Sequence, residues 1–271
     1  MAQTVCFVNN KGGVGKTMAA SSIGIAWARM GKKILFVDLD SQANLTSAIS
    51  QVDTLNQKWE RTLEDAFIDG PEAGLPIEHT DDPNVDYVPS DLDLANFEKD
   101  TARTSFSELL LFDLLQTVKN DYDYIIIDCP PSLSKLTYNA MIASDYLVLV
   151  TLPEGRSCKG LEMIVSLYNE ITSNKRFNPN LVIIGVLVSK VEKDKISQYF
   201  IDYLNKSYSD LVLQPYIPKS TKVAQSTSFD STIYEVEPNG KVAQAYLKVS
   251  QELLVRIIDD AAGREQGSVN G

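Results

Sequence analysis

The stretch Lys11-Gly12-Gly13-Val14-Gly15-Lys16-Thr17 decides the fold, and it directly follows the apolar run Val5-Cys6-Phe7-Val8. An apolar run, a glycine-rich turn and a helix beginning near Lys16 form the strand–loop–helix arrangement of a phosphate-binding loop. Glycines let the backbone N–H groups curl around an anion, and the helix N-terminus adds partial positive charge. We therefore expect nucleotide contacts from these residues: Lys11, Gly12, Gly13, Val14, Gly15, Lys16, Thr17 and Met18.

The start of this loop departs from the usual pattern. Asn10 stands where a glycine is usual, and a second lysine, Lys11, opens the loop. At its other end, Lys16 is placed to reach the β and γ phosphates of a nucleotide, and the Thr17 hydroxyl is placed to bind Mg²⁺.

The composition indicates a single intracellular domain. A chain of 271 residues suits one large α/β domain, expected over 1–262, followed by a disordered tail over 263–271. Three cysteines do not make a disulfide framework in such a chain, so a reduced, buried thiol is expected for Cys6. The sequence contains no evident signal peptide and no run approaching the roughly 20 apolar residues of a membrane span. These features favour the cytoplasm.

Charge is distributed unevenly along the chain. The net charge is −11, and residues 53–130 carry 19 acidic but only five basic side chains. The segment 186–225 is mildly basic through Lys190, Lys193, Lys195, Lys206, Lys219 and Lys222. A nucleic-acid partner therefore requires a local basic face. The alternative, that these lysines form an ordinary solvated surface, stays open.

Apolar runs alternate with helical patterns along the chain. The runs that predict strands are 5–8, 34–37, 85–88, 124–127, 146–151, 181–188 and 211–217. The segments that predict helices are 16–30, 91–99, 105–119, 135–143, 158–173, 195–207 and 241–260. This alternation predicts an α/β fold with a doubly wound, mostly parallel sheet and helices on both faces. The acidic segment 53–84 is expected to be a surface excursion.

Acidic side chains follow two of the predicted strands. Asp38 and Asp40 come directly after one apolar run, and Asp128 ends another. Ligands bind at the carboxyl ends of the strands in such a sheet, so these acids are expected beside the phosphate loop. A carboxylate there can bind Mg²⁺ through its water or position an attacking water. The stiff turn Cys129-Pro130-Pro131-Ser132 that follows fits a switch beside the γ-phosphate.

Taken together and in this order, the motifs resemble the ParA/MinD family of deviant Walker ATPases, and most of all the small ParA partition ATPases. The resemblance extends over about residues 2–258, and the blocks that carry it are 11–17, 38–46, 123–133, Pro153-Glu154 with Gly160-Leu161, and 217–225. Departures from the family pattern are Ser41, Ala43, Asp230 and the strand end Val188-Ser189-Lys190.

The resemblance implies roles for individual residues. Lys16 would bind ATP, and Lys11 would cross a dimer interface to the nucleotide of the neighbouring subunit. Asp40 would orient the hydrolytic water. The implied catalytic residues are thus Lys11, Lys16 and Asp40, the implied Mg²⁺ residues are Thr17, Asp38 and Asp128, and Pro218 is expected to line the adenine.

The resemblance also implies a function: a slow, Mg²⁺-dependent ATPase for plasmid or chromosome partition. Its ATP-bound dimer would bind DNA non-specifically on the nucleoid, and a ParB-like centromere-binding protein would stimulate hydrolysis. The candidate DNA contacts are Lys190, Lys193, Lys195, Lys219 and Lys222. No segment precedes the first strand that would suit an operator-reading domain, so autorepression is not expected.

Three alternatives remain at this point. A MinD-like membrane ATPase needs a basic amphipathic C-terminal helix, but the segment 241–260 ends in Asp259-Asp260, so packing on the sheet is expected instead and no membrane partner is expected. A nitrogenase-iron-protein-like reductase needs suitably placed cysteine pairs, which Cys129 and Cys158 do not match. A ParA-like protein that positions another cargo is indistinguishable from a partition ATPase by sequence.

Overall fold

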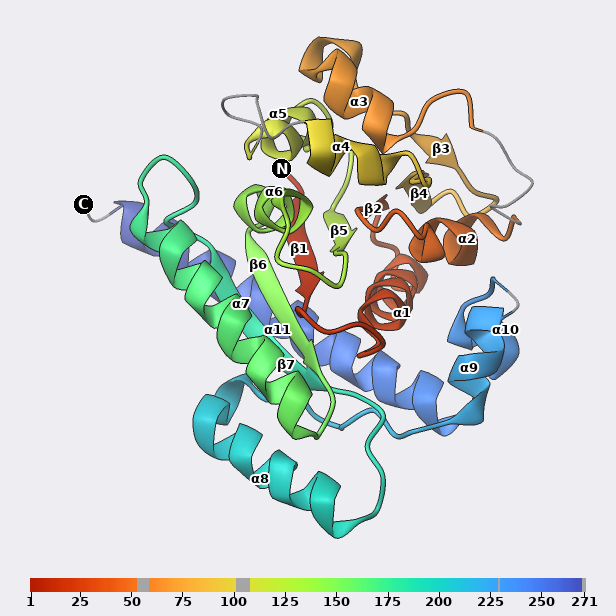
Figure 1. The fold of residues 1–271 in the computed structure, drawn as a ribbon, viewed down its shortest axis with the longest axis vertical. Helices are drawn as coiled ribbons and strands as arrows, with labels where there is room; N and C mark the ends of the chain where they lie inside the picture. The colour runs from red at the N-terminus through yellow and green to blue at the C-terminus, as the bar shows by residue number, and fades with distance from the viewer. Residues whose placement is uncertain (53–58, 101–107, 229, 270–271) are drawn as a thin grey trace.

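The computed structural model describes residues 1–52, 59–100, 108–228 and 230–269. Within them, a seven-stranded sheet with the order β3-β4-β2-β5-β1-β6-β7 forms the centre of the molecule (Figure 1). The strands are β1 (Gln3–Val8), β2 (Ile34–Asp38), β3 (Glu78–His79), β4 (Val85–Val88), β5 (Tyr124–Asp128), β6 (Tyr146–Thr151) and β7 (Val182–Val188). Neighbouring strands are parallel except β3 and β4, which confirms the predicted mostly parallel sheet.

Helices cover both faces of this sheet (Figure 1). On one face lie α1 (Lys16–Arg29) and α11 (Lys241–Val269), and on the other lie α6 (Lys135–Ala143) and α7 (Gly155–Ser173). The remaining helices are α2 (Asn44–Ser50), α3 (Leu63–Asp69), α4 (Leu94–Asp100), α5 (Leu110–Gln116), α8 (Lys195–Tyr208), α9 (Thr221–Ser228) and α10 (Ile233–Val236).

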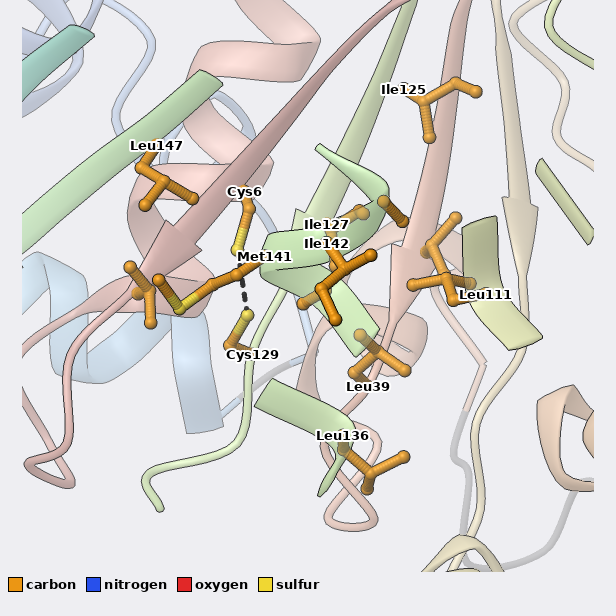
Figure 2. Close-up of a cluster of buried hydrophobic side chains, with 14 of the residues drawn as sticks. Cys6, Leu39, Leu111, Ile125, Ile127, Cys129, Leu136, Met141, Ile142 and Leu147 are labelled. Atoms are coloured by element: carbon orange, nitrogen blue, oxygen red, sulfur yellow. Dashed lines mark hydrogen bonds between the residues drawn. The ribbon is translucent and has the colours of Figure 1, made fainter. Parts of the chain in front are cut away.

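Successive side chains of a strand enter different apolar clusters. In β1, Val5 and Phe7 pack on the face covered by α1, whereas Cys6 and Val8 pack on the face covered by α6. Burial on both faces explains why the central strands are apolar at nearly every position. Figure 2 shows part of the cluster on the α6 face, in which the Sγ atoms of Cys6 and Cys129 lie 3.0 Å apart as free thiols. The expected reduced, buried Cys6 is therefore found.

The prediction of a strand over 211–217 is wrong. Only isolated bridges join this part of the chain to the sheet edge, one between Val212 and Val186 and one between Pro218 and Val191. Pro215 lies inside the segment and has no N–H to donate to a strand ladder, so the two bridges do not join into one strand. The apolar character of the segment that suggested a strand instead reflects burial of its side chains in the core.

The C-terminal helix is longer than predicted. The helix α11 continues to Val269, so most of the tail expected over 263–271 is helical, and residues 270–271 lie outside the described part of the chain. A glycine inside a helix costs only about 1 kcal/mol, so Gly263 does not end it. The helix predicted over 105–119 is shorter, because α5 spans Leu110–Gln116 and residues 101–107 are not among those described.

The helix α11 packs on the body of the protein, as expected. Trp27 of α1 donates its indole N–H to the carbonyl oxygen of Ser250 at 2.8 Å, and Tyr246, Val249 and Leu253 are buried. The apolar stripe of α11 is thus occupied by contacts with α1 and the sheet. Among the described residues, no helix combines the length and apolar character needed to cross a membrane.

Candidate active site

The loop between β1 and α1 has the backbone shape of an anion cradle. Gly13 and Gly15 adopt φ angles of 72° and 92°, in the left-handed region that favours glycine. Asn9 fastens the start of the loop: its Nδ2 donates to the carbonyl of Val150 at 2.6 Å, and its Oδ1 accepts from the Lys11 N–H at 2.9 Å. The loop is therefore tied to β6 before any ligand binds.

A cavity of about 360 Å³ opens over this loop at the carboxyl ends of the strands. Its lining brings together most of the predicted phosphate-loop residues with Asp40 from the end of β2. The lining residues are Gly12, Gly13, Gly15, Lys16, Thr17, Met18, Ser21, Asp40, Gln42, Asn44, Ala48, Pro131, Lys190, Val223, Ser226, Asp230 and Ser231. The volume and the loop suit a nucleotide whose phosphates sit on the loop.

Two of the residues predicted to bind Mg²⁺ are in contact: Thr17 in the cavity lining and Asp128 at the end of β5. Thr17 Oγ1 donates to Asp128 Oδ2 at 2.5 Å, which joins the start of α1 to the end of β5. The other carboxylate oxygen, Asp128 Oδ1, is buried and has no hydrogen-bond partner among the residues that the structure describes. A buried carboxylate oxygen without a partner, next to a threonine hydroxyl, fits a hard cation or its bound water. The donor set therefore suits Mg²⁺.

Asp38 differs from Asp128 in that both of its carboxylate oxygens accept hydrogen bonds. Its Oδ1 accepts from the Asp40 N–H at 3.0 Å, and its Oδ2 accepts from the N–H and the hydroxyl of Thr46 at 2.8 and 2.9 Å. These bonds hold the turn after β2 in place. Asp38 thus contacts the segment that carries Asp40, and its role in binding Mg²⁺ stays a prediction.

Burial raises the pKa values of both acids at these strand ends. The pKa of Asp38 rises from 3.8 to about 6 through desolvation, against the hydrogen bonds from Thr46 and Asp40. Burial and then the nearby Asp38 carboxylate raise the pKa of Asp128 well above its ordinary value, while Lys16 acts in the opposite direction. Two carboxylates in an apolar surrounding favour a positive partner, which is what a bound cation supplies.

Asp40 is held in position by its own backbone. Its N–H is bound by Asp38, its carbonyl accepts from Ser90 Oγ at 3.0 Å, and its Oδ1 accepts from the Gln42 N–H at 3.1 Å. Its side chain lines the main cavity and also a smaller hollow beside Pro131. This places a carboxylate between the phosphate loop and the turn after β5, where a water could be oriented.

Lys11 forms an ion pair within its own chain, outside the cavity lining. Its ammonium forms an ion pair with Glu154, at the start of α7, and the residue does not line the cavity formed by the described part of the chain. Lys16 is nearly buried, at 6% exposure, and its Nζ lies 3.5 Å from the Lys11 carbonyl oxygen. The two lysines of the loop therefore point to different places.

The predicted DNA contacts do not form one group. Lys190 lines the cavity and donates to the Gly13 carbonyl at 2.7 Å. Lys219 pairs with Glu192, and Lys222 donates to Gln225 at 3.1 Å. Lys193 and Lys195 lie near the start of α8 and are exposed, as are Lys190 and Lys219.

At the end of the cavity near α9 and α10, the lining comes from residues that were not predicted to contact the nucleotide, and Pro218 is not among them. Within the described chain, Pro218 pairs with Val191 and is not part of the lining, so its adenine contact stays a prediction. The lining from α9 to α10 comes instead from Val223, Ser226, Asp230 and Ser231. Only the family-like block over 217–225 pointed to this region.

Comparisons with known proteins identify the family of this chain. A family model described as "AAA domain" matches residues 2–183. The sporulation initiation inhibitor protein Soj of Bacillus subtilis (strain 168) is 32% identical over 256 residues, which cover 93% of this chain and 98% of that protein. The chromosome partitioning protein ParA of Caulobacter vibrioides is 29% identical over 264 residues, which cover 96% of this chain and 97% of that protein.

A solved structure shares the fold of this chain over nearly its full length. Cobyrinic acid a,c-diamide synthase from Mycobacterium smegmatis, with bound ADP and magnesium, has a TM-score of 0.78 to this chain at 27% identity, over 94% of each chain. The ADP and magnesium belong to that protein. On the family model and the nearly full-length relatives, this chain belongs to the AAA domain family and, within it, to the ParA and Soj partition ATPases.

Proposed function

We propose that this chain hydrolyses ATP to ADP and phosphate with Mg²⁺, and that its ATP-bound dimer holds DNA during partition of a plasmid or chromosome. One observation supports the chemistry most. A single cavity is lined by the phosphate loop and Asp40, and Thr17 in its lining is bonded to Asp128, which keeps a buried oxygen without a partner among the described residues. These are the parts that phosphoryl transfer to water requires.

In this proposal the chain supplies position and charge. The loop amides and Lys16 bind the β and γ phosphates, and Thr17 and Asp128 hold Mg²⁺ directly or through water. Mg²⁺, when bound, neutralises the charge that develops on the transferred phosphate. Asp40 accepts a hydrogen bond from the attacking water and orients it toward the γ-phosphate. Slow turnover is expected, because a switch must remain in its ATP state long enough to act.

Dimerisation would change the partner of Lys11. In the single chain its ammonium is bound by Glu154, and in the proposed dimer it would reach the neighbour's nucleotide instead. The charge of the ATP phosphates would then hold two subunits together. Hydrolysis removes the γ-phosphate and part of that attraction, so the nucleotide state shifts the monomer–dimer equilibrium.

DNA binding is assigned to lysines outside the cavity. Lys193 and Lys195 are exposed, Lys219 lies just before α9, and Lys222 lies in its first turn. Binding without sequence preference needs contacts to DNA phosphates, and lysines provide them with release of counterions. We propose a location on the nucleoid in the cytoplasm and a ParB-like partner that stimulates hydrolysis.

A DNA retention experiment tests this function. Immobilised DNA of random sequence is incubated with the protein and Mg²⁺, together with ATP, ADP or no nucleotide, at increasing salt. Retention with ATP alone, decreasing steeply with salt, is expected. Absence of retention at low salt with ATP and Mg²⁺ would contradict the proposal.

The membrane alternative receives less support, because the apolar stripe of α11 is buried against α1. Co-sedimentation with anionic liposomes in the presence of ATP would reverse this ranking. A ParA-like protein that positions another cargo would share the whole site, and a neighbouring gene for a ParB-like protein would distinguish partition from it.

A further inference from the structure

The outer edge of the phosphate loop is held by the end of β7. Such a loop binds an anion through its N–H groups, so its carbonyls point outward and need donors elsewhere. Two successive carbonyls of the loop find donors on two successive residues. Ser189 Oγ donates to the Val14 carbonyl at 2.5 Å, and Lys190 Nζ donates to the Gly13 carbonyl at 2.7 Å.

Hydrogen bonds within the protein hold the backbone that carries these two donors. Ser189 is only 2% exposed, and its N–H donates to the Thr151 carbonyl at the end of β6 at 2.8 Å. On the other side, the Val191 N–H donates to the Ile217 carbonyl at 2.9 Å. The backbone on either side of the pair is thus fixed by contacts within the protein, and it does not depend on a ligand.

Lys190 has an unusual backbone conformation for its residue type. Its φ of 53° lies in the left-handed region, which residues other than glycine, asparagine and aspartate seldom adopt. Such strain persists where the surrounding structure imposes it, and it gathers at functional sites. Lys190 directly follows β7 and lines the cavity. Its ammonium donates to the Gly13 carbonyl.

We propose that Ser189 and Lys190 are positioning residues that keep the loop amides turned toward the phosphates before a nucleotide binds. This inference rests on the proposed function and deepens it. The peptide between Gly13 and Val14 follows two glycines and has wide conformational freedom. Without a donor on the Gly13 carbonyl, part of the nucleotide's binding free energy would be spent on ordering this peptide.

The proposal assigns Lys190 to the nucleotide cavity and removes it from the DNA face. Its ammonium is bound to a backbone carbonyl of the loop in the cavity wall, whereas Lys219 and Lys222 are bound to side chains outside the cavity lining. Both ATP and ADP contact the loop, so the effect of Lys190 on their binding should be similar. A residue that sensed only the γ-phosphate would separate the two nucleotides.

Binding of fluorescent ATP and ADP analogues to matched variants tests the proposal. Lys190→Met keeps the length of the side chain but removes the ammonium, and about tenfold weaker binding of both nucleotides is expected from the loss of a charged hydrogen bond. Lys190→Arg retains a donor and should restore most of the affinity. Lys175→Met removes one exposed positive charge beyond the end of α7, outside the cavity lining, and is the control.

The variant Lys190→Gly distinguishes an effect on the position of the loop from an effect on the stability of the fold. Glycine relieves the left-handed strain, so the thermal midpoint should be no lower than that of the wild type, while nucleotide affinity still falls. Loss of affinity in a variant of undiminished stability identifies a positioning effect. Affinity equal to that of Lys175→Met in both Lys190→Met and Lys190→Gly would overturn the proposal.

Hydrogen exchange in the nucleotide-free protein gives a second readout. Amides of residues 12–16 should exchange faster in Lys190→Met than in wild type or Lys175→Met, and unchanged exchange would count against the proposal. If Lys190→Met binds nucleotide normally but loses DNA retention, Lys190 is a DNA contact and the inference is wrong. If the wild type binds no nucleotide, the proposed function fails, while the exchange comparison still decides whether Lys190 orders the loop.

Discussion

Asp38 and Asp128 are paired in register at the ends of β2 and β5, and their side chains are 1% and 0% exposed. Thr46 and the Asp40 N–H satisfy Asp38, whereas Asp128 keeps one oxygen without a partner. Lys16 lowers the pKa of Asp128, but burial and the Asp38 carboxylate outweigh it. In the absence of a cation, this pair therefore favours a proton.

Stability of the protein without nucleotide and Mg²⁺ should fall as the pH rises. The pKa of Asp38 is raised from 3.8 to about 6, so the folded state binds a proton more tightly than the unfolded chain. This stabilisation is fully present below the unfolded pKa and is lost as the pH rises through about 6. We expect a loss of about 1 kcal/mol between about pH 5 and pH 7, measured by urea unfolding with a chelator.

The same experiment on Asp128→Asn provides the control. The Asp38 carboxylate raises the pKa of Asp128, and repulsion between two negative charges is mutual. Removing the charge of Asp128 should therefore make the decline in unfolding free energy over this pH range smaller. An unchanged pH profile would mean that the two acids do not influence each other.

Lys16→Ala should abolish nucleotide binding. The ammonium is nearly buried at the base of the cavity and is the cation placed for the β and γ phosphates. A loss of affinity of about 100-fold or more is expected for ATP, measured by titration calorimetry. Circular dichroism establishes that the variant is folded, and tight ATP binding by a folded variant would refute the assignment.

Asp40→Ala should bind ATP but hydrolyse it slowly. Asp40 is held by its backbone through Asp38 and Ser90, so removing its carboxylate loses the hydrogen bond from the Gln42 N–H but keeps these two contacts. We expect phosphate release to fall by about 10²-fold or more, with little change in ATP affinity, and the dimer to accumulate by size-exclusion chromatography with ATP. Hydrolysis at the wild-type rate would show that another group orients the water.

Lys219→Ala combined with Lys222→Ala should weaken DNA retention and its salt dependence. The partners of these lysines, Glu192 and Gln225, are side chains near the surface, so removing the two ammonium groups should change stability little. Each phosphate contact removed lowers the slope of log affinity against log salt by about 1. ATP affinity measured in parallel should be unchanged, and a slope equal to that of the wild type would remove both residues from the DNA face.

Local features of the chain were predictable from the sequence because they depend on residues close together. The turn over 11–17 needs positive φ angles at Gly13 and Gly15, and a glycine-rich sequence predicts such a turn. Likewise, apolar runs followed by an acid place Asp38 and Asp128 at strand ends, and the alternation with helices requires a parallel sheet. The strand prediction over 211–217 was wrong because apolar content alone does not distinguish a strand from another buried segment.

The sequence by itself thus determined the phosphate loop, the order of strands and helices and the presence of acids beside the loop. Only the tertiary structure decided which partner each charged side chain contacts. Glu154 lies 143 residues from Lys11 along the chain, and Gly13 lies 177 residues from Lys190. A lysine count does not reveal whether an ammonium faces solvent, DNA or a loop carbonyl, since its direction depends on the backbone at its own position and on segments that only folding brings near.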